Sequence, residues 1–197
     1  MELIWYGHWG RPILAFPTSL GRATQNEDGG IIRGLEDKIE GGEIQICCVD
    51  SVDEDSWYNK NAPPEWRVHR HDQYDRYLSS EVVPFIRGKA QREDIITYGA
   101  SFGAYHAVNF AFRHLDHIAR VIAFSPGIMQ PDKARGKPPI YISHGTSDGV
   151  LPIGVTSRTF VPRLKKLGYD VTYHEFDGRH QVPDEIAREA FEWSLKK

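Results

Sequence analysis

The sequence predicts an α/β fold, with a mostly parallel seven-stranded sheet and helices on both faces. Short apolar runs rich in β-branched and aromatic residues recur along the chain, and segments with apolar residues at helical spacing separate them. The chain has 197 residues and shows no internal repeat, low-complexity tract or linker. We therefore expect a single domain over residues 1–197.

Seven segments have the composition of strands: Glu2–Tyr6, Ile13–Phe16, Ile44–Val49, Ile95–Tyr98, Val121–Phe124, Ile140–Ser143 and Val171–Phe176. The first two are separated only by Gly7–Pro12, which predicts an antiparallel hairpin at one edge of the sheet. The other strands are expected to run parallel, with crossover helices between them.

The helical segments show apolar residues three or four positions apart. Their stripes begin at Ile32, Tyr74, Ala104, Phe160 and Ile186. Pro84 is expected to stop the second helix, Gly168 to end the fourth, and Asp184 to cap the last. The aperiodic segments Ser51–His71 and Pro126–Pro139 follow carboxyl ends of strands, where open α/β sheets place their ligand crevice.

Composition excludes several classes of partner. The formal net charge is −3 and no long run of one sign occurs, so we expect no nucleic acid or anionic lipid partner. The longest apolar runs, such as Ile13–Pro17 and Val121–Phe124, are far shorter than the roughly 18 residues of a membrane span. We therefore expect no membrane partner either.

The first residues, Met1–Trp5, lack the basic and apolar regions of a signal peptide. Cys47 and Cys48 are adjacent in an apolar run, where neighbouring side chains point to opposite faces of a strand. We expect them to be two small core residues rather than a disulfide. These observations favour a reducing, cytoplasmic location.

The strongest local signal is Gly99-Ala100-Ser101-Phe102-Gly103, between the strand Ile95–Tyr98 and the helix that follows. A G-x-S-x-G in that context is typical of a nucleophile elbow, because small flanking residues permit the tight turn that lifts the serine Oγ to the helix N-terminus. The N–H of Phe102 then faces the negative charge that develops beside Ser101. The alternative is a glycine-rich turn with an incidental serine.

A serine nucleophile needs a base and a carboxylate that orients the base, in the chain order Ser, Asp or Glu, His in this architecture. Asp148 follows the strand Ile140–Ser143 and His180 follows the last strand, so Ser101, Asp148 and His180 form the candidate triad. Asp177 is the rival orienting carboxylate.

Three other histidines have structural interpretations. His144 lies at a strand end and His174 within a strand, as expected for core or supporting residues. His106, inside the elbow helix, is expected to pack or to make a hydrogen bond near the site.

The second oxyanion donor is expected from the loop after the strand Ile13–Phe16. Ser19 is the first candidate for the backbone N–H donor and Thr18 the next. The alternative is a polar turn without a catalytic role.

Several segments carry a resemblance to a known family: Phe16–Gly21, Val49–Ser51, Ser56–Asn59, Ser80–Pro84, Gly99–Gly103 and Gly178–His180. Together they resemble the α/β-hydrolase superfamily and, more closely, its putative-esterase group, which includes esterase D, feruloyl esterases and the mycolyltransferases. The elbow is specific to the superfamily. The Trp-Tyr segment followed by a Glu-x-x-Pro helix is typical of the group.

The resemblance implies an α/β-hydrolase fold with Ser101 as nucleophile, His180 as base and Asp148 as its carboxylate partner. It implies the N–H groups of Ser19 and Phe102 as oxyanion donors, although the loop lacks the His-Gly pair common in esterases. The usual first strand is missing, so seven strands are expected instead of eight.

The resemblance also places Trp57 and Tyr58 near the substrate pocket, the alternative being a buried aromatic pair under a loop. Thr18 is a further candidate for the pocket. Only about 15 residues separate the strands Val121–Phe124 and Ile140–Ser143, too few for a cap domain. We therefore expect an open crevice that suits small or short-acyl esters.

Our first hypothesis is a serine carboxylic-ester hydrolase that acts on a small-molecule ester and needs no metal or other cofactor. An acyltransferase would use the same acyl-enzyme and pass it to an alcohol or a thiol. A metal-dependent hydrolase is motivated by His69-x-His71 and His114-x-x-His117, but neither pair has a third ligand at metal-site spacing. A non-catalytic binding module is disfavoured because all three triad residue types occur in order.

Overall fold

The computed structural model describes residues 1–114, 116–127 and 137–196. Its strands are β1 (Leu3–Tyr6), β2 (Arg11–Phe16), β3 (Ile44–Val49), β4 (Ile95–Ala100), β5 (Ile118–Phe124), β6 (Ile140–Gly145) and β7 (Val171–Phe176). They form one sheet in the order β1-β3-β2-β4-β5-β6-β7. In this described sheet β1 runs antiparallel and the other strands run parallel, which confirms the predicted fold class.

The predicted hairpin between the first two strands is wrong. β1 pairs with β3, with Leu3 opposite Val49, and β2 lies on the other side of β3. Burial explains the arrangement: all six residues of β3 are buried, whereas the four residues of β1 are only half-buried. A buried strand needs a partner on each side, and a short half-buried strand suits the edge of a sheet.

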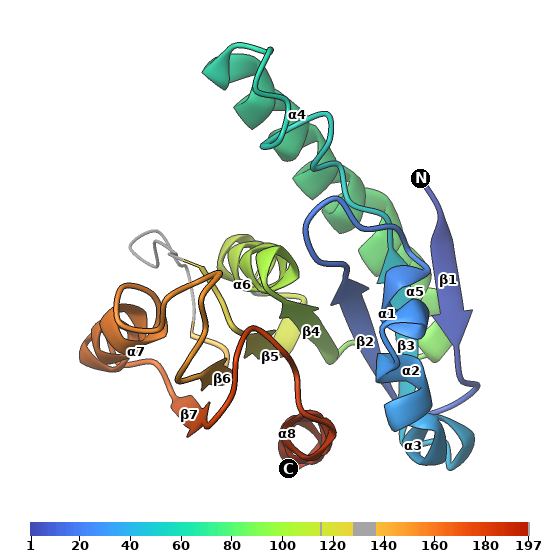
Figure 1. Ribbon diagram of the computed structural model, residues 1–197. Helices are drawn as coiled ribbons and strands as arrows, with labels where there is room; N and C mark the ends of the chain where they lie inside the picture. The colour runs from blue at the N-terminus through green and yellow to red at the C-terminus, as the bar shows by residue number, and fades with distance from the viewer. Residues whose placement is uncertain (115, 128–136, 197) are drawn as a thin grey trace.

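Helices cover both faces of the sheet (Figure 1). One face carries α4 (Pro64–Tyr77), the π-helical turn η1 (Leu78–Val82), α5 (Val83–Ala90), α6 (Phe102–Arg113) and α7 (Ser157–Lys166). The other face carries α1 (Gln25–Asp28), α2 (Ile31–Gly34), α3 (Glu36–Glu40) and α8 (Asp184–Leu195). In Figure 1, α6 and α8 lie on opposite sides of the central strands, and α4 extends away from the sheet.

Three local expectations about helices are corrected. Pro84 does not stop a helix but lies in the first turn of α5, where the missing proline N–H is tolerated, and η1 joins α5 to α4. The segment Ser51–His71, expected to be aperiodic, becomes helical at Pro64; the sequence did not indicate this because residues 64–71 are mostly polar and show no apolar stripe. Asp184 is the first residue of α8, and Pro183 occupies the N-cap position.

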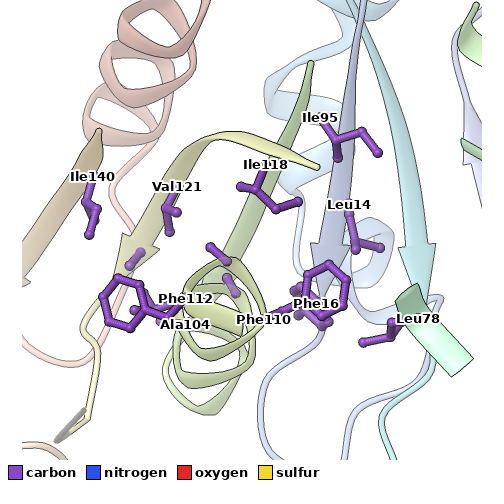
Figure 2. Close-up of a cluster of buried hydrophobic side chains, with 14 of the residues drawn as sticks. Leu14, Phe16, Leu78, Ile95, Ala104, Phe110, Phe112, Ile118, Val121 and Ile140 are labelled. Atoms are coloured by element: carbon purple, nitrogen blue, oxygen red, sulfur yellow. The ribbon is translucent and has the colours of Figure 1, made fainter. Parts of the chain in front are cut away.

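The sheet divides the core into two layers. On one side, Phe16 of β2 packs against Phe110 of α6 with ring centroids 6.3 Å apart, in a cluster that also contains Leu14 and Val121 (Figure 2). On the other side, Tyr98 of β4 packs against Phe191 of α8, with ring centroids 5.3 Å apart. Alternate residues of each strand supply the two layers, as the pleat of a strand requires.

Cys47 and Cys48 are buried in β3, one in each layer, and neither forms a disulfide. The prediction of two small core residues is therefore confirmed. Burial raises the pKa of both thiols to about 12, so neither is ionised at neutral pH.

The register of the parallel strands aligns the ends that carry the candidate residues. The opposed pairs are Phe16 with Gly99, Ala100 with Phe124, Phe124 with Ser143, and Gly145 with Phe176. The loops after β2, β4, β6 and β7 therefore open onto one edge of the sheet. The chain order reverses beside β2, so the ends of β2 and β4 form the kind of switch point where open α/β sheets bind ligands.

Candidate active site

Ser101 stands between β4 and α6 in a strained backbone conformation. Its φ is 55° and its ψ is −121°, a region that residues other than glycine rarely adopt. The Ser101 N–H donates to the Phe124 carbonyl at 2.8 Å, and its own carbonyl accepts the Ala104 N–H at 3.1 Å. Strain of this kind costs about 1–3 kcal/mol and persists only where surrounding contacts hold it. The conformation has the shape expected of a nucleophile elbow.

The two glycines of the motif permit close approaches that no side chain would allow. A Cβ on Gly99 would lie 2.1 Å from the Gly103 carbonyl oxygen, which shows how tight the turn is. A Cβ on Gly103 would lie 2.4 Å from the Pro17 carbonyl oxygen. The first turn of α6 therefore presses against the loop after β2, and Ser101 is brought beside the candidate oxyanion loop.

Asp148 and His180 are joined at the ends of β6 and β7. His180 Nδ1 lies 2.6 Å from Asp148 Oδ2; the Asp148 side chain is fully buried, whereas that of His180 is 22% exposed. The Ser147 N–H donates to the Gly178 carbonyl at 2.9 Å, so the two loops are also tied through their backbones. The carboxylate that contacts His180 thus belongs to Asp148 and not to its sequence rival Asp177.

Both carboxylate oxygens of Asp148 are engaged. Oδ1 accepts the N–H groups of Val150 and Leu151, each at 2.8 Å, and Oδ2 lies 3.1 Å from His144 Nε2. Burial by itself would raise the pKa of Asp148, but the hydrogen bonds from His180 and the two backbone N–H groups outweigh it and hold the pKa below its usual value. Asp148 is therefore ionised at neutral pH and can orient an imidazole.

His144 is a supporting residue beneath this pair. Its Nδ1 lies 2.7 Å from Ser157 Oγ and its Nε2 lies 2.8 Å from the Leu151 carbonyl oxygen. Burial lowers its pKa, so the ring is neutral at pH 7. Because both ring nitrogens have partners, the partly exposed His180 is the better candidate for a base.

The structure does not join Ser101 to His180 by a hydrogen bond; the recorded partner of His180 is Asp148. In unliganded enzymes such bonds are often long and tighten only when substrate is bound. Ser101 nevertheless lines the same cavity as Val150 and Leu151, whose N–H groups hold Asp148. The three predicted triad residues therefore lie at one sheet edge, and two of them are in contact.

The loop after β2 distinguishes the two candidate oxyanion donors. The Thr18 N–H donates to Gln25 Oε1 at 2.6 Å, and the Gln25 side-chain amide also donates to Thr18 Oγ1. Within the described residues, the N–H groups of Ser19 and Phe102 have no hydrogen-bond acceptor. Free donors on the two sides of the elbow are the arrangement that an oxyanion needs, which supports Ser19 over Thr18.

A cavity of about 450 Å³ opens beside Ser101. Its lining is largely apolar and aromatic: Ser19, Trp57, Tyr58, Ser101, Phe102, Tyr105, Gly127, Val150 and Leu151. Trp57 and Tyr58, the two predicted pocket residues, both line this cavity, whereas Thr18 lines a different and smaller one. Most of the predicted pocket loop Pro126–Pro139 falls on residues 128–136, outside the described residues.

Two of the histidines that motivated the metal-site alternative make other contacts. His71 packs against Trp57, and His114 Nε2 lies 2.7 Å from Asp75 Oδ2. In the part of the chain that the structure describes, no three His, Cys, Asp or Glu side chains gather as a metal site would need. No helix among these residues has the length and apolar character to cross a membrane.

Several residues around the site carry no sequence signal. Gln25, Tyr105 and Leu151 lie in segments without a motif, so only the fold shows that they hold the oxyanion loop, line the cavity or contact His144. His106 was expected to make a hydrogen bond near the site, and its Nε2 lies 2.8 Å from Asp53 Oδ1.

Comparison with known families decides the membership of the chain. The family model described as "Putative esterase" matches residues 24–135, more than half of the chain. The chain belongs to this family. The matched segment contains the elbow and the Trp57–Tyr58 pair but ends before Asp148 and His180. A comparison with curated protein sequences finds no significant match.

Solved structures with the same fold include several esterases. Esterase PE8 superposes with a TM-score of 0.74 at 18% identity over 98% of this chain and 95% of its own. A Bacillus cereus carboxylesterase gives 0.72 at 16% identity, over 98% and 93%. A ferulic acid esterase from Anaeromyces mucronatus, solved with ferulic acid, gives 0.69 at 14% identity, over 98% and 88%. At these identities the likeness shows the α/β-hydrolase-like fold of small esterases.

Replacing Gly103 by alanine should destabilise this esterase-family fold. The new Cβ would meet the Pro17 and Phe16 carbonyl oxygens at 2.4 and 2.9 Å, so we expect a loss of about 2–3 kcal/mol in the free energy of unfolding, measured by urea denaturation. Gly88→Ala is the matched control, because Gly88 is an exposed helical glycine with open space around its Cβ position and should gain up to about 1 kcal/mol. Equal stability of both variants would contradict the proposed close approach.

His71 should make the fold sensitive to acid. Burial, with a smaller contribution from nearby His106, lowers its pKa to about 4, whereas in an unfolded chain a histidine titrates near 6.5. Between these pH values His71 is protonated in the unfolded chain but neutral in the native state. The free energy of unfolding therefore falls as the pH drops from about 7 to about 4.5, by roughly 2–3 kcal/mol from this group. Urea denaturation at both pH values should show a smaller fall for His71→Phe and an unchanged fall for the exposed control His69→Phe.

Proposed function

We propose that this protein is a serine carboxylesterase that forms an acyl-enzyme on Ser101. The observation that carries the proposal is the 2.6 Å contact between Asp148 and His180 at the same sheet edge as the strained Ser101. Membership of the esterase family supports an ester as the substrate. The free N–H groups of Ser19 and Phe102 supply the donors that the reaction requires.

In the acylation step, Ser101 Oγ attacks the ester carbonyl carbon while His180 Nε2 takes the hydroxyl proton. Asp148 accepts the Nδ1–H bond and stabilises the imidazolium that forms. The carbonyl oxygen becomes an oxyanion and accepts hydrogen bonds from Ser19 and Phe102. When the carbon–oxygen bond to the alcohol breaks, His180 returns the proton to the departing alkoxide.

In the deacylation step, His180 takes a proton from water as the water oxygen attacks the acyl carbon. Collapse of the second tetrahedral intermediate returns the proton to Ser101 Oγ and releases the acid. An alcohol in place of water would give an ester instead, which is the acyltransferase alternative. Product analysis with an added alcohol separates the two, since ester formation far above the statistical share indicates transfer.

The cavity favours small neutral esters. No charged side chain lines its described part, and aromatic rings form much of the wall. Only residues 125–139 join β5 to β6, so the described helices include no cap at this position. An open apolar crevice of about 450 Å³ can hold a short acyl group and the reacting carbonyl.

Replacing the nucleophile tests the proposal directly. Ser101→Ala should reduce kcat for p-nitrophenyl acetate by about 10⁴-fold or more, because no other group can form the acyl-enzyme. The far-UV spectrum and melting temperature should be unchanged or slightly improved, since the strained position loses only a hydroxyl. Ser80→Ala, at an exposed serine away from the cavity, is the control. Wild-type turnover by Ser101→Ala would overturn the proposal.

Acyl-chain length tests the substrate class. With p-nitrophenyl esters from acetate to dodecanoate, kcat/KM should be highest for the shorter chains and fall about tenfold or more for the longest, because an open pocket of this size cannot cover a long chain. A steady rise of kcat/KM with chain length would contradict the assignment to short-acyl esters.

A further inference from the structure

A buried Asp–His pair lies behind the site, and the triad makes no use of it. Asp53 belongs to the loop after β3, and His106 lies one turn into α6. His106 Nε2 is 2.8 Å from Asp53 Oδ1, and both side chains are almost completely buried. A contribution to fold stability does not by itself explain why such a pair is buried, because burying ionisable groups carries a desolvation cost.

The second oxygen of Asp53 holds the oxyanion loop. Asp53 Oδ2 accepts the Leu20 N–H at 3.0 Å. Leu20 has a φ of 60°, in the left-handed region that favours glycine, and its side chain is 50% exposed. Little side-chain packing therefore holds Leu20 in this conformation, and the hydrogen bond to the Asp53 carboxylate can hold it instead.

The loop conformation determines where the Ser19 N–H points. The Thr18 carbonyl accepts the Gly21 N–H at 3.0 Å. In a planar trans peptide the carbonyl and the next N–H point in opposite directions, so this bond also orients the Ser19 N–H. Asp53 fixes the following peptide through Leu20, and the two bonds together leave the Ser19 N–H little freedom.

Asp53 also anchors the loop that carries the cavity wall. Its carbonyl oxygen accepts the Tyr58 N–H at 2.9 Å. The Tyr58 hydroxyl in turn lies 2.7 Å from Ser19 Oγ, and its ring meets Phe102 edge to face at 5.5 Å. One buried aspartate is thus connected to both predicted oxyanion donors.

We propose that Asp53, held in place by His106, is a positioning residue that sets the Ser19 N–H relative to the elbow. His106 and Phe102 lie on the same helix, and their rings are 5.0 Å apart. The Asp53–His106 contact therefore holds the oxyanion loop in a defined position relative to α6, which follows the nucleophile Ser101. The inference rests on the proposed function. In this proposal the Asp53–His106 pair contributes to stabilising the transition state, because an oxyanion donor acts mainly on the charge that develops during the reaction.

The same helix offers a matched control. His114 Nε2 lies 2.7 Å from Asp75 Oδ2 at the other end of α6, in a pair that joins α6 to α4. Both pairs link α6 to a neighbouring segment, but only the Asp53 pair contacts the oxyanion loop. A purely structural role predicts similar consequences for the two pairs.

The experiment compares Asp53→Ala and His106→Phe with Asp75→Ala and His114→Phe, using p-nitrophenyl acetate and thermal unfolding. We expect Asp53→Ala and His106→Phe to lower kcat about 10- to 100-fold with KM changed less than about threefold. The control pair should keep kcat within about threefold, whatever its melting temperature.

Conservative variants keep the test decisive if the first variants unfold. His106→Gln places an amide donor near the position of Nε2, and Asp53→Asn keeps an acceptor for Leu20. Both should recover kcat to within about fivefold of wild type. As a measure independent of turnover, the Leu20 amide should exchange with solvent faster in Asp53→Ala and at the wild-type rate in Asp75→Ala.

The outcomes separate the inference from the proposed function. An inactive Ser101→Ala together with wild-type kcat in Asp53→Ala and His106→Phe overturns the inference and leaves the esterase proposal standing. Equal losses of kcat in both Asp–His pairs also overturn it. A fully active Ser101→Ala removes the proposed function, and the inference with it.

Discussion

The close approach of α6 to the end of β2 is the constraint on which the site depends. Gly103 has no side chain, so the first turn of α6 lies directly against the Pro17 carbonyl, where a Cβ would come within 2.4 Å. The same contact brings the start of α6, with the proposed donor Phe102, beside the loop that carries the proposed donor Ser19. A larger residue at position 103 would separate the two donors that the proposed reaction uses together.

The opposite half of the site is built on buried polar contacts. Asp148 is enclosed by two backbone N–H groups and two imidazole rings, which keep it ionised although it is fully buried. His144 fills the space beneath it and is itself held by Ser157. These contacts fix the position of the carboxylate, so little reorganisation would remain for the proposed reaction.

Local sequence signals succeeded where one short segment decides the structure. Gly99–Gly103 predicts the turn, the serine at its apex and the helix that follows, because backbone sterics act within a few residues. The places of Ser101, Asp148 and His180 directly after strands predict that they lie at one edge of the sheet, because parallel strands align their carboxyl ends. The hairpin prediction failed for the opposite reason: the partner of β1 is selected by the burial of β3, far along the chain.

Apolar periodicity and small residues at a tight turn are local properties, so they sufficed to predict the fold class and the elbow and to name the triad candidates. The folded chain was needed to show which carboxylate contacts His180, whether the Thr18 or the Ser19 N–H is free, and that Asp53 and His106 contact each other behind the oxyanion loop. The first and the last of these contacts join residues 32 and 53 positions apart, and the Thr18–Gln25 bond that leaves Ser19 free depends on how the loop folds back against α1. Their geometry depends on strand order and helix packing, which composition and spacing constrain but do not specify.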